Sequence, residues 1–312
     1  MNLAIDLMQV LLLIAIAPLV RGVIARLKAW MQNRRGASVW RPYVDLLKLF
    51  RKEDMVPDTA SPLFRLAPVI LFAATVTAAA LVPVLHASAL FGVGGDFILL
   101  VYLLAIGRFF LMLGAMDGGS SFGGLGASRE ALVSALAEAP MLLALTSVAI
   151  LTHTISLPGI VLATVVQNPL HLSPVYVFAF GAMVLVAIAE TGRIPVDNPS
   201  THLELTMIHE AMVLEYSGPS LALIEWASAV KLTLIMALLA GVFAPWGMAT
   251  SASIGAMALA PVAFVLKLAV LTIAIAVIES SMAKLRMYLV PDFLGMASAL
   301  AILAVAFTAL MR

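Results

Sequence analysis

Apolar stretches of about 20 residues, the length that a membrane-spanning helix needs, recur along the whole chain. The stretches 66–85 and 293–311 contain no charged residue. Six further stretches carry at most two charged residues each: 2–20, 97–116, 131–151, 174–189, 220–244 and 254–278. Of these, 174–189 is slightly shorter than the others. The sequence therefore predicts an all-α, polytopic membrane protein with about eight transmembrane helices in a single transmembrane domain over residues 1–312.

Composition excludes several other classes of protein. Of the 312 residues, 63% are hydrophobic and 11% are charged, whereas soluble domains have about 45–50% apolar and about 25% charged residues. The absence of cysteine excludes disulfides, iron–sulfur clusters and thiolate zinc sites on this chain. A net charge of +1 provides no basic field that attracts nucleic acid. We therefore expect membrane lipid around the chain, no cofactor or metal on it, and no nucleic-acid partner.

Lysine and arginine are distributed unevenly between the two sides of the predicted bundle. Ten of the 18 lie in residues 21–65, and such an excess is typical of cytoplasmic loops. With eight spans in the inner membrane, the cytoplasmic loops are about 21–65, 117–130, 191–219 and 280–292, and both termini lie on the outer, periplasmic side. The apolar stretch 155–166 is too short to span, so we interpret it as an interfacial or re-entrant segment.

Five charged residues lie well inside the predicted spans. A charge at mid-bilayer costs at least about 2.5–3.5 kcal/mol, and such residues face other helices or a wet cavity. Arg108, Lys231 and Lys267 lie near the middle of their spans. Glu138 and Glu225 lie one or more turns inside theirs. One interpretation is a connected proton or ion relay, and the alternative is a set of packing ion pairs or snorkelling side chains. Because arginine stays protonated, Arg108 fits the packing role as well as the relay.

The stretch 190–218 is rich in acidic residues and contains one basic residue, Arg193. Its acidic residues are Glu190, Asp197, Glu204, Glu210 and Glu215. A helix over 201–215 would place Glu204 and Glu215 on one face. Carboxylates that crowd together at a membrane surface have raised pKa values, which suits proton uptake. The alternative is a solvated acidic loop, but the interleaved apolar residues favour a loop that packs against protein.

The stretch 43–50 has apolar residues at helical spacing beside basic residues such as Lys48. This pattern predicts an amphipathic helix that lies in the membrane interface. The alternative is a basic anchor on the cytoplasmic side with no further role. Under either interpretation the stretch offers a docking surface for a partner.

Two motifs resemble those of a known family. The sequence ETGRIPVDNP in the acidic stretch, and RRG followed by P-Y-x-D-x-x-K-L-x-x-x-E in the first loop, resemble the membrane subunit of complex I that is called subunit 1. The stretches 120–132 (SSFGGLGASREAL), 215–231 (EYSGPSLALIEWASAVK) and 278–287 (IESSMAKLRM) are similar to the corresponding subunit of group-4 membrane-bound nickel–iron hydrogenases, of the formate hydrogenlyase and hydrogenase-4 type.

This resemblance implies roles for particular residues. The subunit joins a cytoplasmic redox arm to an ion-translocating membrane arm. The resemblance, together with the charges inside the spans, implies a proton or ion path through Arg108, Glu138, Glu190, Asp197, Glu204, Glu215, Glu225, Lys231, Lys267 and Glu279. It places at the joint with the redox arm Arg34, Arg35, Asp45, Lys48, Glu53 and Arg193.

The resemblance also implies partners. These are the hydrogenase large and small subunits and iron–sulfur subunits on the cytoplasmic side, which would hold the nickel–iron centre and the clusters, together with antiporter-like membrane subunits. We therefore expect a membrane-anchoring, proton-path subunit without a catalytic centre of its own. One alternative is the quinone-site subunit of a complex I-type NADH:quinone oxidoreductase. A stand-alone secondary transporter would show an inverted repeat, which is not evident. The sequence leaves the electron donor open.

Overall fold

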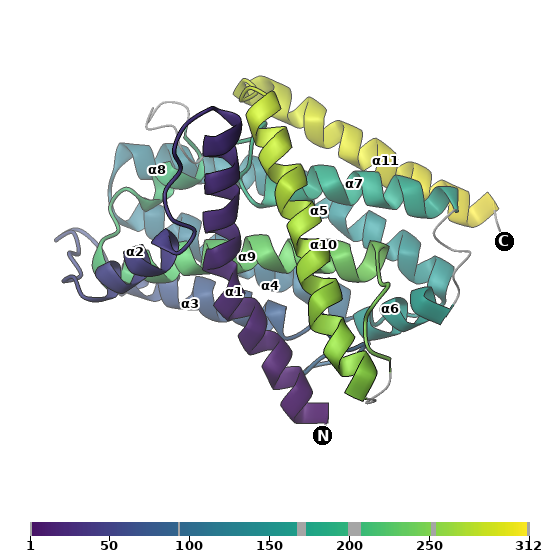
Figure 1. The fold of residues 1–312 in the computed structure, drawn as a ribbon. Helices are drawn as coiled ribbons and strands as arrows, with labels where there is room; N and C mark the ends of the chain where they lie inside the picture. The colour runs from purple at the N-terminus through teal and green to yellow at the C-terminus, as the bar shows by residue number, and fades with distance from the viewer. Residues whose placement is uncertain (1, 93, 167–172, 199–206, 251–253, 311–312) are drawn as a thin grey trace.

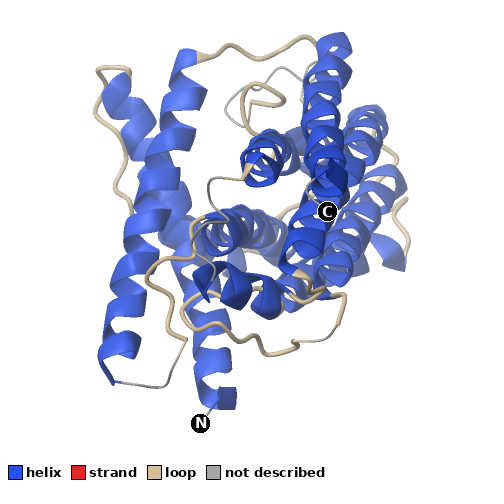
Figure 2. Ribbon diagram, turned by 90° about the vertical axis from the view of Figure 1, so that its right-hand side faces the viewer, coloured by secondary structure: helices blue, strands red, loops and turns tan. Residues whose placement is uncertain are grey.

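The computed structural model describes residues 2–92, 94–166, 173–198, 207–250 and 254–310. Within these ranges the regular structure is helical, without a β-strand (Figure 2). The elements follow the order α1 (Asn2–Met31), α2 (Arg41–Phe50), α3 (Pro62–Ala79), α4 (Asp96–Asp117), α5 (Ser121–Thr152), α6 (Leu157–Val166), α7 (Pro174–Glu190), α8 (His209–Val213), α9 (Gly218–Phe243), α10 (Ile254–Ser281), η2 (Met287–Leu289) and α11 (Val290–Leu310).

Seven of the described helices are long and apolar enough to cross a membrane, namely α1, α3, α4, α5, α9, α10 and α11 with its preceding turn. The eighth expected span, α7, has 17 residues and is shorter than this group. The all-α, polytopic membrane architecture is therefore confirmed, whereas the number of eight spans is not. Helix α6 has only 10 residues, so its interfacial or re-entrant position stays a prediction.

Proline and serine mark the starts of several helices. Pro62, Pro174 and Pro219 lie in the first turns of α3, α7 and α9. Proline is favoured there because the first backbone N–H groups of a helix have no intrahelical partner, and its fixed φ suits the helix. At α3 the preceding Ser61 also accepts a hydrogen bond from the backbone N–H of Leu63, which satisfies one of these free donors.

Two helices extend into stretches that the sequence assigned to loops. Helix α1 continues to Met31, and Ile24 in this extension is fully buried. Helix α5 begins at Ser121, which leaves little of the predicted loop 117–130. A Cβ at Gly126 would lie 2.9 Å from the backbone oxygen of Ile208, so glycine lets the start of α5 pack directly against the segment before α8.

The two helices expected within the loops differ in outcome. Helix α2 confirms the amphipathic helix over 43–50, and it packs against α1 and α9. The Tyr43 hydroxyl donates a hydrogen bond to the backbone oxygen of Ala15, at 2.5 Å. Of the predicted helix over 201–215, the described residues 207–215 are helical only over the five residues of α8. Residues 201–206 lie outside the described residues.

Helix α9 forms the centre of the fold. It contacts α1, α2, α3, α6, α7 and α10. In an apolar 18-residue stretch of this helix, 78% is buried inside the protein. Helices α1 and α10 lie against each other and cross over α9, while α5, α7 and α11 pack together beside it (Figure 1). A charged residue on the buried surface of α9 is therefore surrounded by other helices rather than by lipid.

Candidate functional site

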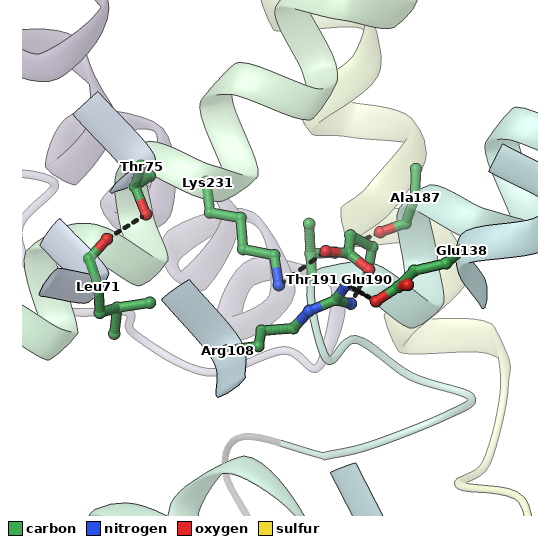
Figure 3. Close-up of polar contacts among 8 residues, drawn as sticks. All are labelled: Leu71, Thr75, Arg108, Glu138, Ala187, Glu190, Thr191 and Lys231. Carbon is green, nitrogen blue, oxygen red and sulfur yellow. Dashed lines mark hydrogen bonds and ion pairs between the residues drawn. The ribbon is translucent and has the colours of Figure 1, made fainter. Parts of the chain in front are cut away.

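Four charged side chains from four helices meet inside the fold (Figure 3). We call Arg108 of α4, Glu138 of α5, Glu190 of α7 and Lys231 of α9 the central ion cluster. Nη2 of Arg108 lies 2.8 Å from Oε1 of Glu138, and Nη1 of Arg108 donates to Oε2 of Glu190. Nζ of Lys231 lies 3.0 Å from the other oxygen, Oε1, of Glu190. Glu190 therefore bridges the two cations.

Most of the central ion cluster is buried. The side chains of Arg108 and Glu190 are 6% and 2% exposed, and Lys231 is 13% exposed. Glu138 is 31% exposed, so it is the member that solvent or a partner reaches most easily. Arg108 lies on the buried face of α4 together with Leu104 and Leu111, because residues three and four apart share one face of a helix. The cluster therefore stabilises its charges by mutual pairing.

A second group of charges joins the C-terminal end of α10 to the rest of the fold. Glu279 of α10 pairs with Arg193, at 2.9 Å, and with Lys28 of α1. The Glu279 side chain is fully buried. We call these three residues the α10 ion triad.

Two ion pairs lie near both groups. Arg21 of α1 pairs with Glu225 of α9. Asp197 pairs with Nζ of Lys284 at 2.6 Å, and its other carboxylate oxygen accepts backbone hydrogen bonds from Ile208 and His209, each at 3.2 Å. Asp197 therefore fixes the start of α8 relative to the segment that follows α10.

One internal cavity connects these groups. It has a volume of about 80 Å³, and one water needs only about 10–15 Å³ of such space. The ionisable residues that line it are Arg21, Arg108, Glu130, Glu190, Arg193, Asp197, His209, Glu210 and Lys231. The cavity therefore brings ionisable side chains from α1, α4, α5, α7, α8 and α9 around one space that is large enough for water. Within the described parts of the chain, no group of three or more histidines and carboxylates is arranged to hold a metal ion.

Glu210, outside the spans, differs from an ordinary glutamate in its protonation. Burial raises the pKa of its carboxyl group above the ordinary value of 4.5, and the nearby carboxylates of Glu225 and Asp197 raise it further. His209 and Arg21 oppose this shift. Glu210 therefore accepts a proton at a higher pH than a solvated glutamate.

We expect Glu210→Gln to raise the melting temperature at pH 7 by about 1–3 °C. Because the folded pKa lies above the unfolded value, the folded state binds more protons, and its stability falls as the pH rises above 4.5. The glutamine variant lacks this loss, so its advantage grows with pH and disappears below pH 4.5. Thermal unfolding of the purified protein at several pH values measures it. The exposed Glu215, as Glu215→Gln, is the matched control, and equal curves for both variants would contradict the prediction.

The structure brings together most of the predicted ion-path residues. The central ion cluster contains Arg108, Glu138, Glu190 and Lys231, and Asp197 lines the same cavity. Glu225 and Glu279 reach that cavity through their partners Arg21 and Arg193. Glu215 is exposed and is not among the residues lining the cavity. Glu204 lies outside the described residues.

Lys267 lies in different surroundings from the other charged residues of the spans. Its Nζ is 4.8 Å from the centre of the Trp246 ring. It lines a separate cavity between α7, α9 and α10. The expectation that both mid-span lysines meet in one connected cluster is therefore not met by this geometry, and a role of Lys267 in ion movement stays a prediction.

The residues expected at the redox arm are mostly on the surface. Arg34, Arg35, Lys48 and Glu53 are exposed, while Asp45 is half-buried and pairs with Arg41 at 2.9 Å. Arg193 differs from this set, because its side chain is only 12% exposed and pairs with Glu279 within the α10 ion triad.

Several residues of the site were not predicted from the sequence. Arg21 and Lys28 were assigned only to a basic loop, and Glu130 and His209 were not considered as site residues. Arg21 and Lys28 are seven residues apart, which places them on one face of a helix. This spacing could have predicted that α1 continues beyond Arg21 and that both cations face neighbouring helices.

Known proteins resemble this chain over nearly its whole length. The model of the family described as NADH dehydrogenase matches residues 4–310. Formate hydrogenlyase subunit 4 of Escherichia coli K12 is 35% identical over 93% of this chain and 94% of that protein. Hydrogenase-4 component C of the same organism is 33% identical over 95% and 92%.

More distant relatives share the same fold or part of the sequence. A subunit of the NADH-quinone oxidoreductase of Thermomicrobium roseum is 30% identical over 70% of each chain. A chain in the solved structure of the membrane-bound sulfane sulfur reductase, an archaeal respiratory membrane complex, superimposes with a TM-score of 0.81. This superposition covers 99% of this chain and 100% of that one at 19% identity, so the fold is shared. On the full-length match, the chain belongs to the NADH dehydrogenase family of membrane subunits.

Proposed function

We propose that this chain is the membrane-anchoring and ion-path subunit of a membrane-bound nickel–iron hydrogenase complex of the formate hydrogenlyase or hydrogenase-4 type. The observation that carries the choice of complex is the extent of similarity. The two hydrogenase-type relatives match more than nine-tenths of the chain, whereas the NADH-quinone oxidoreductase relative matches 70%. The quinone-site subunit of a complex I-type enzyme is therefore the weaker alternative.

In this proposal the chemistry of hydrogen occurs on partner subunits. The chain has no cysteine, and its described residues contain no group suited to a metal ion, so its residues do not fit a nickel–iron centre or an iron–sulfur cluster. Those groups would belong to large, small and iron–sulfur subunits on the cytoplasmic side, with antiporter-like subunits in the membrane. The exposed side chains of Arg34, Arg35, Lys48 and Glu53 suit a surface that meets such an arm.

The central ion cluster suits the ion-path role because its charges depend on one another. Glu190 lies between two cations, Arg108 and Lys231, and both favour its charged form. Of these two cations only Lys231 can release a proton, because arginine stays charged, so Lys231 is the member that would pass a proton into the cavity that it lines. Glu138, which is partly exposed and bonded to Arg108, exchanges protons with the surroundings. Arg108 stays charged and holds the two carboxylates in place.

The same proposal covers the arrangement in the membrane. The chain would form one domain over residues 1–312 in the inner membrane, with both termini on the periplasmic side. Residues 21–65, 117–130, 191–219 and 280–292 would face the cytoplasm. The lysines and arginines counted above support this orientation.

We expect the tagged chain, purified in mild detergent from its native membrane, to carry about one nickel per chain and to oxidise hydrogen with an artificial dye. A complex I-type assembly would instead oxidise NADH, reduce quinone and contain no nickel. Metal analysis and both activity assays on the same preparation distinguish these results. A chain that purifies alone, with neither activity, would contradict both assignments.

A further inference from the structure

A continuous groove runs between α7 and α10 with α9 as its floor. It consists of two cavities of about 220 and 450 Å³. Both cavities are lined by Phe180, Leu239 and Leu271, so they join end to end. We call this feature the α7–α10 groove. Figure 1 shows α10 crossing over α9 beside α7, with the end of α9 and the start of α10 on the same side.

The two ends of the groove are charged and the part between them is apolar. At one end it reaches Arg193 and Glu279 of the α10 ion triad. At the other end it reaches Lys267 and Trp246. The lining between these ends consists mainly of aliphatic and aromatic side chains, among them Val184, Leu232, Met236, Phe243, Val270 and Ala274.

The groove is open toward the surroundings of the bundle. Val177 and Val270, which line its wider part, are 61% and 59% exposed. Val270 lies on α10, which is long and apolar enough to cross a membrane, and Val177 lies on the shorter apolar helix α7. Lipid molecules therefore have direct access to the groove from the side.

Lys267 lacks a counter-ion within the described protein. The residue is only 5% exposed, and none of the ion pairs between described residues includes it. Its cation–π contact with the Trp246 ring stabilises the ammonium less than an ion pair with a carboxylate would. Because burial of an unpaired charge is costly, an anion from outside the chain would stabilise Lys267.

The position of Lys267 suits the phosphate of a lipid. Tryptophan is enriched at membrane–water interfaces, and Trp246 lies in the connection between the end of α9 and the start of α10. The side chain of a helical lysine points toward the N-terminus of its helix, which for α10 is this same end. The ammonium therefore lies beside the connection that carries Trp246, 4.8 Å from the centre of its ring, rather than among the ion pairs between the helices.

The lining of the groove favours a hydrocarbon chain, because aliphatic and aromatic side chains make up most of it between the charged ends. A single acyl chain is narrow and flexible, and it needs no hydrogen bonds from the lining. We propose that the α7–α10 groove binds one anionic phospholipid, with its phosphate at Lys267 and an acyl chain along α9.

Native mass spectrometry of the detergent-purified, delipidated complex tests this proposal. The probes are long-chain phosphatidylglycerol, which is anionic, and phosphatidylcholine of the same chain length. We expect one tightly retained phosphatidylglycerol per chain, at least a tenfold weaker retention of phosphatidylcholine, and weak binding of dihexanoyl phosphatidylglycerol, whose short chains cannot fill the groove.

Three variants separate the charge from the groove. Lys267→Gln should reduce phosphatidylglycerol retention at least tenfold, and Lys267→Arg should restore it. Ala274→Trp keeps the charge but fills the groove, so it should also reduce retention. Lys52→Gln, a change at an exposed lysine elsewhere, should have no effect. Hydrogen oxidation with an artificial dye and the composition of the complex confirm that each variant is assembled.

Three results would overturn the proposal. The first is equal retention of the two long-chain lipids, and the second is retention by Lys267→Gln equal to that of the unaltered protein. The third is loss of a neighbouring membrane protein from the Lys267→Gln complex with unchanged lipid retention, which would assign Lys267 to a carboxylate of a partner protein. None of these results depends on which redox reaction the complex performs.

Discussion

Replacement of Arg108 by methionine should remove nearly all of the correctly folded protein from the membrane. The guanidinium of Arg108 forms ion pairs with both Glu138 and Glu190. Methionine cannot form these pairs, so both carboxylates would lose the positive charge of Arg108. The Glu190 side chain is only 2% exposed. Loss of one partner from a buried ion pair costs about 3–5 kcal/mol, which is a large part of the roughly 5–15 kcal/mol that separates folded from unfolded states.

The amount of Arg108→Met protein in the membrane and its melting temperature in detergent measure this effect. The double variant Arg108→Met with Glu138→Gln should recover part of the loss, because glutamine removes the carboxylate that has lost its partner, while Glu190 keeps its pair with Lys231. Arg26→Met changes an exposed arginine on α1 and should behave as the unaltered protein. If the single Arg108 variant were as stable as the Arg26 variant, the ion pairs of the cluster would contribute nothing to the fold.

The membrane helices could be predicted from the sequence because length and hydropathy are local properties of a segment. The ends of α1 and α5 could not be predicted in the same way. A search for apolar stretches ends where charged residues begin, but the backbone of α1 continues through Arg21 to Met31. It does so because the charges on this extension find partners on α9 and α10, namely Glu225 and Glu279.

The sequence could predict which residues belong to the candidate site, but not which of them pair with each other. Sequence position gives the depth of Arg108, Glu138 and Lys231 in the membrane, but their pairing depends on where α4, α5, α7 and α9 cross. These helices are apolar nearly all round, so no polar face indicates which neighbour each one meets. Lys231 and Lys267 show the consequence. They have equivalent positions in their spans, but one meets Glu190 and the other meets Trp246.

Lys231→Arg should stop hydrogen-driven proton movement while leaving hydrogen oxidation in place. Arginine retains the positive charge beside Glu190, so the buried pair and the fold are preserved. Arginine does not release its proton in proteins, so a path that requires Lys231 to become neutral is blocked. Removal of a positioned proton-transfer group typically lowers a rate by about 100-fold or more, so we expect the number of protons moved per hydrogen oxidised to fall at least tenfold.

Inverted membrane vesicles, with proton movement and hydrogen oxidation recorded in parallel, give this ratio directly. Lys52→Arg makes the same substitution at an exposed position and should leave the ratio unchanged. Lys231→Met removes the charge that pairs with Glu190, so it should reduce assembly as well as proton movement, which separates loss of the pair from loss of proton release. An unchanged ratio in Lys231→Arg would mean that Lys231 acts only as a fixed counter-charge, and the ion path would then have to avoid Lys231.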